Sequence, residues 1–583
     1  MKLHQIDTTL TVTAQIAVDD MTSIAGSGSG FQTIICNRPD GETPDQVAFA
    51  DIHAAAEAAG MKAHYLPAVT GQVSDADGKA FAALLATSPH PVLAYCRSGT
   101  RSATMWALSQ VGTQSADAIL QTTHTAGFDL SALADRFAAP EPTEMTAVSE
   151  SGASATNVEN VASVAKGNHH QIVIVGGGSA GIATASSLLA RDSGLDIAII
   201  EPNERHSYQP GWTMVGGGIF KADTTARNMS EVIPAGVKRI VGAVATFDPE
   251  NNTLALEDGS TVSYQQLIVC PGLTLDWDAI PGLNDALGHD GVTSNYRYDL
   301  APYTWQLVQS LRGGKALFTQ PAMPIKCAGA PQKAMYLSAD HWRREGVLKD
   351  IQIEFCNAGG VLFGVPEYVP ALMEYIHAYG IQINFTRSLV AIDGKAKQAT
   401  FKQTAADGTV SELVQDYDMI HVVPPQKAPD FIRSSPLADA AGWVDIDPGS
   451  MRHTRFSNVY ALGDVGNSSN AKTAAAVRKQ APVVAHNVLV ALGKLQGAAT
   501  YDGYGSCPLT VERGRIVLAE FTYGGKLAPS LPQWLINGTR PTRLAWLLKE
   551  RILPPLYWEG MLKGREWLAK PTIKPTIKPD LKP

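Results

Sequence analysis

The stretch QIVIVGGGSAG at residues 171–181 decides the fold. Its first five residues have the composition of a buried parallel strand, and its glycines, in GxGxxG spacing, open a helical run at 182–191. The three glycines permit, in order, a tight turn, close approach of the backbone to a pyrophosphate, and close packing of helix on strand. The helix start presents N–H groups to the phosphates. The stretch therefore predicts a dinucleotide site, with candidate binding residues Gly176, Gly178, Ser179, Ala180 and Gly181.

The next strand ends in an acidic residue where such sites bind ribose. Apolar residues at 196–200 lead into Glu201, twenty residues after the last glycine. A carboxylate there accepts both ribose hydroxyls, which predicts FAD or NAD rather than a dinucleotide with a 2′-phosphate. Two later segments, LIVCPG at 267–272 and VYALGD at 459–464, resemble segments of the two-dinucleotide-binding flavoproteins. This resemblance implies FAD, with its ribityl chain held at Gly463 and Asp464.

The second nucleotide fingerprint of those flavoproteins is missing from the sequence. It should follow the apolar strand at 351–355, where the chain instead reads CNAGGVLFG at 356–364. This stretch lacks the GxGxxG spacing that a nicotinamide dinucleotide needs. We therefore expect two Rossmann-like modules, of which only the first binds a dinucleotide, and an electron donor other than NADH.

Length and composition indicate a multidomain globular α/β protein. A chain of 583 residues exceeds a single core, and a net charge of −8 gives no electrostatic reason to expect nucleic acid. The six cysteines form no CxxC pair, so no metal site is predicted. The expected parts are a small α/β domain at 1–138, a linker at 139–169, the FAD-binding two-Rossmann region at 170–535, amphipathic helices at 536–570 and a disordered tail at 571–583.

The C-terminal region has a basic, aromatic composition unlike the rest of the chain. From Gly538 onward there are ten Lys or Arg and four Asp or Glu. Such a segment suits short helices lying in a membrane interface, or equally a helix pair docked on the protein's own core. No stretch reaches the ~18 apolar residues of a spanning helix, and no secretory signal is visible. We expect a peripheral (monotopic) protein at the cytoplasmic face of the inner membrane.

Four further stretches carry the most specific pattern. They are ERHSYQPGWTMVGGG at 204–218, PIKCAGAPQK at 324–333, GNSSNAKTAAAV at 466–477 and YDGYGSCPL at 501–509. Together they resemble the signatures of the sulfide:quinone oxidoreductases, particularly the form close to the mitochondrial enzyme. In that family two cysteines near the flavin form a disulfide or trisulfide that sulfide opens. By motif, the resemblance places them at Cys327 and Cys507.

The residues around Cys327 suit a reactive thiol. Lys326 and Lys333 would lower its pKa and so favour the attacking thiolate, while the flanking prolines restrict the loop. Lys472 and Lys549 are candidates near the flavin and the quinone. A cysteine within an apolar strand is usually a small buried hydrophobe, which is our interpretation of Cys36, Cys270 and Cys356.

The family resemblance also implies a reaction and its partners. Sulfide attacks the Cys327–Cys507 bridge, leaving a persulfide on Cys507, and two electrons pass from Cys327 through FAD to a quinone. The sulfane sulfur then leaves to an acceptor such as glutathione or sulfite. The alternatives are an NADH:quinone oxidoreductase and a sensor that binds FAD without turnover. Whether the chain forms a homodimer stays open.

The N-terminal domain has a nucleophile site of its own. A predicted strand at 92–95 leads into CRSGTRS at 96–102, a loop of backbone N–H groups that starts at Cys96 and is closed by Arg101 at a helix N-terminus. Four residues separate the cysteine from the arginine, whereas tyrosine phosphatases have five. This shorter loop resembles rhodanese, and with CNRPDGE at 36–42 the domain resembles the phosphatase-fold family often called sulfur transferases. We expect Cys96 to accept and relay sulfane sulfur; phosphatase activity is the rival interpretation.

Overall fold

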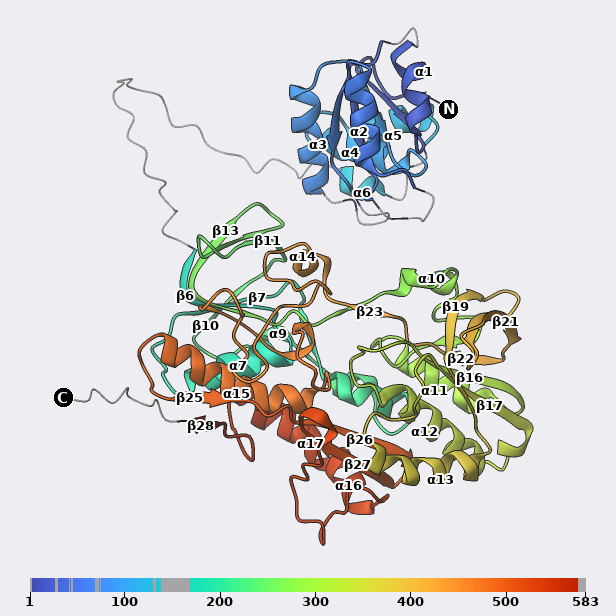
Figure 1. The fold of residues 1–583 in the computed structure, drawn as a ribbon, viewed down its shortest axis with the longest axis vertical. Helices are drawn as coiled ribbons and strands as arrows, with labels where there is room; N and C mark the ends of the chain where they lie inside the picture. Colours follow the sequence, from blue (N-terminus) through green and yellow to red (C-terminus); the bar gives the residue numbers. More distant parts are fainter. Residues whose placement is uncertain are drawn as a thin grey trace, which may run out of the picture. The chain divides into compact units, whose positions relative to one another are not determined.

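The computed structural model describes residues 3–26, 30–40, 42, 46–68, 73, 75–128, 130, 133–137 and 168–574. The chain folds as two compact units, one within Met1–Val161 and the other within Ala162–Pro583 (Figure 1). Apart from residues 168 and 169, the predicted linker lies outside the described residues.

The N-terminal unit is a small, mostly parallel α/β domain. Its sheet has the order β1-β2-β5-β3-β4, and β2, β5, β3 and β4 run parallel, so their carboxyl ends meet at one edge. The strands are β1 (His4–Gln5), β2 (Leu10–Thr13), β3 (Thr33–Cys36), β4 (Lys62–Tyr65) and β5 (Val92–Tyr95). The helices are α1 (Met21–Gly26), α2 (Phe49–Ala58), α3 (Asp75–Thr87), α4 (Thr100–Ser109), α5 (Ala116–Thr125) and α6 (Ala134–Phe137).

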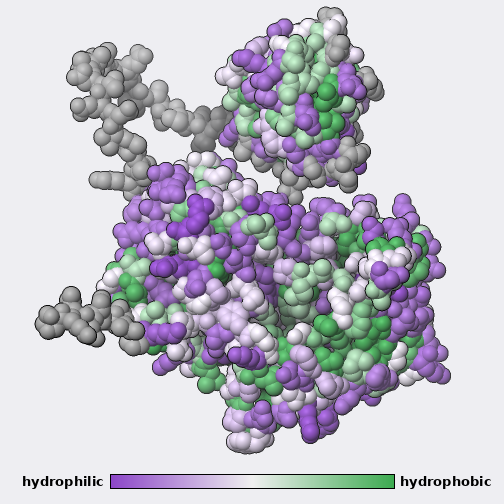
Figure 2. All heavy atoms as spheres, in the orientation of Figure 1, coloured by the Kyte–Doolittle hydropathy of each residue, from purple (hydrophilic) through white to green (hydrophobic). Residues whose placement is uncertain are grey.

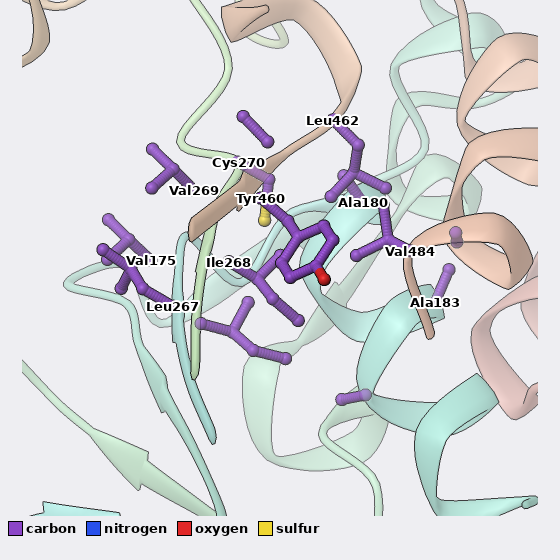
Figure 3. Packing of buried hydrophobic residues seen from close by; sticks show 14 of the residues in the cluster. Val175, Ala180, Ala183, Leu267, Ile268, Val269, Cys270, Tyr460, Leu462 and Val484 are labelled. Carbon is purple, nitrogen blue, oxygen red and sulfur yellow. The ribbon is translucent and has the colours of Figure 1, made fainter. Parts of the chain in front are cut away.

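The larger unit begins with the sheet predicted from the glycine-rich stretch. Its order is β10-β7-β6-β13-β12-β11, and β24 also pairs with β13; β10, β7, β6, β13 and β24 are parallel. The strands are β6 (His169–Val175), β7 (Ile197–Ile200), β10 (Val237–Ile240), β11 (Val244–Asp248), β12 (Thr253–Leu256), β13 (Thr261–Val269) and β24 (Val459–Ala461). Helices α7 (Ser179–Leu189) and α15 (Ala474–Ala491) pack together, and Figure 3 shows Ala180 and Val484 meeting Tyr460 and Ile268 in this core.

A second sheet confirms the second Rossmann-like module. Its five strands, in the order β15-β22-β16-β17-β18, are all parallel. They are β15 (Val292–Thr293), β22 (Met419–His421), β16 (Gly314–Gln320), β17 (Ile351–Asn357) and β18 (Gln382–Phe385), accompanied by α11 (Ala301–Ser310), α12 (Ala330–Arg344) and α13 (Val369–Tyr379). An antiparallel sheet follows, formed by β19 (Arg387–Asp393), β20 (Gln398–Thr404) and β21 (Val410–Asp416).

A C-terminal hairpin follows these sheets, and several short elements lie between their strands. The hairpin strands β26 (Gly505–Glu512) and β27 (Arg515–Phe521) pair antiparallel, and β26 packs on α12. The short elements are α8 (Trp212–Gly216), α9 (Met229–Val232), α10 (Leu283–Ala286), α14 (Asp430–Arg433), β8 (Arg205–Ser207), β9 (Ala226–Asn228), β14 (Thr274–Leu275) and β23 (Gln426–Lys427).

The C-terminal helical segment is docked on the protein and also exposes apolar residues. It comprises α16 (Arg543–Leu547), α17 (Leu553–Pro555) and the π-helical turns Leu548–Ile552 and Leu556–Gly560. Tyr557 and Trp558 are buried, whereas Leu544, Leu547 and Ile552 are about half exposed. In Figure 2 apolar and polar residues intermingle over the part of the unit where Figure 1 places α16 and α17. Among the described residues, the structure has no helix that is long and apolar enough to span a bilayer.

The expected disorder of the tail is wrong where the structure describes it. Thr572–Lys574 forms β28, which pairs antiparallel with β25 (Ala498–Thr500). The low complexity of the tail argued against a packed element, but the backbone of β25 offers hydrogen-bond partners that need no particular side chains. Residues 575–583 lie outside the described part of the chain.

Candidate active site

The glycine turn after β6 has the geometry that the sequence predicted. Gly176 has a φ of +103°, and a Cβ there would lie 2.6 Å from the Cys270 carbonyl oxygen. A Cβ on Gly181 would lie 2.0 Å from the Gly176 oxygen. A Cβ on Gly178 would meet no described atom within 4 Å, and within the described residues no side chain caps α7 there. The first and third glycines are therefore required for packing, while the second leaves space beside the free N–H groups of the helix.

Glu201 points its carboxylate back at this turn. The residue is 7% exposed and accepts hydrogen bonds from the Gly177 N–H (2.8 Å), the Asn203 N–H (2.8 Å) and the Asn203 side-chain amide (2.6 Å). An ionised carboxylate has about four acceptor positions, so capacity remains for a further donor. Glu201 therefore lies beside the glycine turn, and its binding of ribose hydroxyls stays a prediction.

The loop after β24 is held by Lys472. Gly463 has a φ of +77° and donates its N–H to Gln480 (2.9 Å). The buried Lys472 amine donates to the carbonyl oxygens of Asp464 (2.6 Å) and Gly466 (2.9 Å). Burial lowers the pKa of Lys472 to about 8. Asp464 is half-buried, and the loss of solvent around its carboxyl group raises the pKa of that group. Lys472 therefore fixes the shape of the loop rather than facing solvent.

The two cysteines named by the family resemblance meet, although they come from distant segments. Cys327 precedes α12 and Cys507 lies on β26, and their side chains hydrogen-bond to each other. Both are free thiols in this structure. A Cβ on Gly329 would lie 2.4 Å from the Cys507 sulfur, so only glycine at that position allows the approach. Cys36, Cys270 and Cys356 are buried as expected, the first and last within strands and Cys270 directly after β13.

The two thiols have opposite electrostatic settings. The hydrogen bond from Cys507 and the charge of Lys333, whose Nζ lies 3.2 Å from the Cys327 sulfur, outweigh burial and hold the pKa of Cys327 well below its usual value. The pKa of Cys507 is raised by its hydrogen bond to Cys327 and by burial. Cys327 is therefore the thiolate of the pair, and Cys507 carries the proton.

Two further lysines, Lys326 and Lys549, lie in this region. The Lys326 amine donates to Gln209 (2.7 Å), so Lys333 rather than Lys326 makes the contact with the thiol. Lys549, from a π-helical turn, is 4% exposed, and its charge acts on Cys327. Burial and the like charge of Lys333 lower the pKa of Lys549 to about 7.

The backbone of Cys327 joins the thiol pair to the Asp464 loop. The Cys327 N–H donates to the carbonyl oxygen of Lys472 (2.8 Å). Cys327 has a φ of +50°, the left-handed region that is costly for a residue with a Cβ. Residues from three of the quoted motifs thus converge, and the strained backbone directs the sulfur toward Lys333 and Cys507.

The N-terminal nucleophile loop contains an internal ion pair that sequence reasoning missed. Cys96 is fully buried and its sulfur accepts the Gly99 N–H (3.1 Å). The Arg101 guanidinium contacts both carboxylate oxygens of Glu42 (2.7 and 2.8 Å) and donates to the Ala68 carbonyl oxygen (2.6 Å). Cys96 and Arg101 occupy the predicted strand–loop–helix, but the arginine binds an anion from the same chain. The only sequence signal for this contact was the presence of Glu42 in the quoted 36–42 motif.

Comparison with known proteins assigns both units. Residues 2–113 match the family described as "Beta-lactamase hydrolase-like protein, phosphatase-like domain", and residues 170–305 match "Pyridine nucleotide-disulphide oxidoreductase". The N-terminal unit is 36% identical over 132 residues to the beta-lactamase hydrolase-like protein of Xylella fastidiosa, covering 22% of this chain and 30% of that protein. The match therefore spans less than a third of that relative.

The larger unit has relatives that are matched over most of their length. The mitochondrial sulfide:quinone oxidoreductase of Dictyostelium discoideum is 41% identical over 410 residues, 70% of this chain and 88% of that protein. The crystal structure of the sulfide:quinone oxidoreductase from Aquifex aeolicus, 16% identical, shares the fold with a TM-score of 0.57, covering 68% of this chain and 92% of that one. The expected fold class, two Rossmann-like modules preceded by a phosphatase- and rhodanese-like domain, is confirmed. The chain belongs to the sulfide:quinone oxidoreductase family, with an additional N-terminal phosphatase-like domain.

Proposed function

We propose that the larger unit oxidises sulfide with the Cys327–Cys507 pair and FAD, and that a membrane quinone receives the electrons. One observation carries this proposal: two thiols from distant segments are in hydrogen-bond contact, one of them beside a buried lysine. Thiolate, not thiol, is the nucleophile and the better leaving group, so this setting suits disulfide chemistry.

The residues of the first module fit FAD. The open side of Gly178 and the uncapped start of α7 suit a pyrophosphate, and Glu201 has acceptor capacity left for ribose hydroxyls. Gly463, Asp464 and the Lys472 clamp lie beside Cys327, as a ribityl chain leading to the thiols would require. When bound, FAD would accept two electrons as the bond between Cys327 and Cys507 re-forms, and it would supply them to quinone.

The opposite pKa shifts assign roles to the two sulfurs. In the oxidised protein the two are joined, and hydrosulfide attacks Cys507. The S–S bond breaks, Cys507 becomes a persulfide, and Cys327 leaves as a thiolate with the bonding electron pair. Cys327 is the better leaving group because its pKa is lowered, with Lys333 stabilising the charge. A small nucleophile such as glutathione or sulfite then takes the outer sulfur and frees the Cys507 thiolate.

The C-terminal segment supports peripheral contact with a membrane. Leu544, Leu547 and Ile552 are exposed on a segment that also supplies the buried Lys549 near the thiols. A lipid-soluble quinone could therefore approach from the bilayer while the thiols stay within protein. We assign the protein to the cytoplasmic face of the inner membrane.

For the N-terminal unit we propose sulfur transfer. Cys96 directly follows β5 in the loop that leads into α4, and its sulfur accepts the backbone N–H of Gly99. Tethering the unit to the flavoprotein raises the effective concentration of Cys96 near a sulfur donor or its product.

An anaerobic sulfide titration followed by flavin absorbance tests the central proposal. Sulfide should bleach the flavin in the unmodified protein and in a Cys356→Ser control, and quinone should restore the colour. Cys327→Ser and Cys507→Ser should bind flavin but resist bleaching by sulfide. Bleaching by NADH and not by sulfide would instead establish an NADH:quinone oxidoreductase.

A further inference from the structure

Two buried arginines share one carboxylate at the carboxyl edge of the N-terminal sheet. Arg101 is 5% exposed and Arg38 is 4% exposed. Glu42 accepts from the Arg38 Nε (2.8 Å) while it also makes its two contacts with Arg101. Arg38 further donates to Gln15 (2.9 Å), which follows β2. Segments after β2, β3, β4 and β5 thus converge on this ion cluster.

The cluster already satisfies the groups that would bind an oxyanion. Planar guanidinium groups bind carboxylate and phosphate in the same bidentate manner, so the two ligands compete for one position. Hydrogen bonds and charges from Arg101 and Arg38 outweigh burial and lower the pKa of Glu42, which keeps it ionised. The two arginines and Glu42 together carry a net charge of +1. Without the carboxylate the same two arginines would offer a phosphate a charge of +2.

We infer that Glu42 is a specificity residue that closes the Cys96 loop to oxyanions and reserves it for the sulfane sulfur of an alkyl persulfide. This inference rests on the proposed sulfur-transfer function. A phosphate monoester or thiosulfate needs the Arg101 fork and would place its negative charge against Glu42. A persulfide needs no guanidinium contact, because the sulfur to be transferred is itself the atom attacked.

The transfer step requires no oxidant or additional reactant. The Cys96 thiolate attacks the outer sulfur of a protonated alkyl persulfide, R–S–SH. The S–S bond of the donor breaks and R–S⁻ leaves with the bonding electron pair. Cys96 becomes Cys–S–SH, so charge and atoms balance and no net oxidation occurs. Thiosulfate would perform the same transfer by releasing sulfite, which makes it a matched oxyanion donor for comparison.

The first test measures anion binding, which does not depend on sulfur transfer. Glu42→Gln in the full-length protein should bind inorganic phosphate at least about tenfold more tightly than the unmodified protein by titration calorimetry. Glu57→Gln removes the same charge from an exposed helical position in the same unit and should have no effect. Glu42→Asp retains the anion and should stay closed. Equal phosphate affinity of Glu42→Gln and the unmodified protein would overturn the inference.

The second test separates this inference from the sulfur-transfer proposal. Peptide mass spectrometry of the unmodified protein should show one added sulfur on Cys96 after treatment with glutathione persulfide and at least about tenfold less after thiosulfate. Loading by thiosulfate as efficient as by persulfide, or tight phosphate binding by the unmodified protein, would refute the role of Glu42 even if the variant failed to fold. No loading by either donor, together with gained phosphate binding in Glu42→Gln, would refute sulfur transfer and leave the anion gate standing.

Discussion

Replacing Lys333 by methionine should separate the electrostatic part of the thiol chemistry from its geometry. Lys333 is 2% exposed and its side chain is part of the α12 core, where methionine has similar length and flexibility. Loss of the cation raises the pKa of Cys327, so less thiolate is present at neutral pH. Lys349→Met, at an exposed position just after α12, is the matched control.

The magnitude follows from the separation of the charges. At 3.2 Å and an effective dielectric constant of about 20, two unit charges interact by about 5 kcal/mol. Lys549 partly compensates, because its pKa rises once the like charge of Lys333 is gone. If about half of the interaction is lost, ~2.6 kcal/mol, flavin reduction by sulfide slows by about eightyfold.

Stopped-flow absorbance under anaerobic conditions measures this rate across pH. The unmodified protein and Lys349→Met should share one pH profile. In Lys333→Met the rate at pH 7 should fall. It should recover as the pH rises above the raised pKa of Cys327, because the thiolate then forms without help from the lysine charge. An unchanged rate at neutral pH, in a variant that retains its flavin, would refute the assignment of Cys327 as the thiolate stabilised by Lys333.

Three further outcomes follow from the same contacts. Glu201→Leu should lower flavin affinity by about ten- to a hundredfold, which is the usual worth of hydrogen bonds to a charged group. Glu204→Gln, at a nearby exposed position, should leave flavin affinity unchanged. The flavin retained after gel filtration measures both effects. Burial lowers the pKa of Lys549 to about 7, so between pH ~10.4 and 7 the unfolded chain binds a proton at this lysine that the folded chain lacks. The contribution of Lys549 to the free energy of unfolding therefore falls as the pH falls over that range. Lys549→Met should raise the melting temperature at pH 7, by an amount that vanishes above pH ~10.4. Changing Leu544, Leu547 and Ile552 together to serine should reduce co-sedimentation with anionic vesicles, unlike Val410→Ser with Val414→Ser at equally exposed positions on β21.

The sequence predicted what local chain geometry determines. Strand β6, the glycine turn and the start of α7 form a continuous stretch, so spacing alone indicates their structure. The position of Glu201 follows in the same way, because adjacent parallel strands end at the same edge of the sheet.

Contacts between distant segments could not be predicted from composition or periodicity. The thiol pair was found only through the family motifs, and the sequence offered both Lys326 and Lys333 as cations for Cys327. The left-handed backbone at Cys327 and the helical position of Lys333 decide between them. Arg101 and Glu42 are fifty-nine residues apart, and no local sequence pattern predicts that they form an ion pair.

The left-handed backbone at Cys327 lowers the stability of the fold at a residue that the proposed reaction needs. An L-residue in this region costs roughly 1–2 kcal/mol, a penalty that glycine does not incur. Cys327→Gly would relax the bend and abolish the proposed redox pair in one substitution. A search for thermally hardened variants would therefore be drawn toward this position and would select inactive molecules, so it must screen for turnover as well as heat resistance.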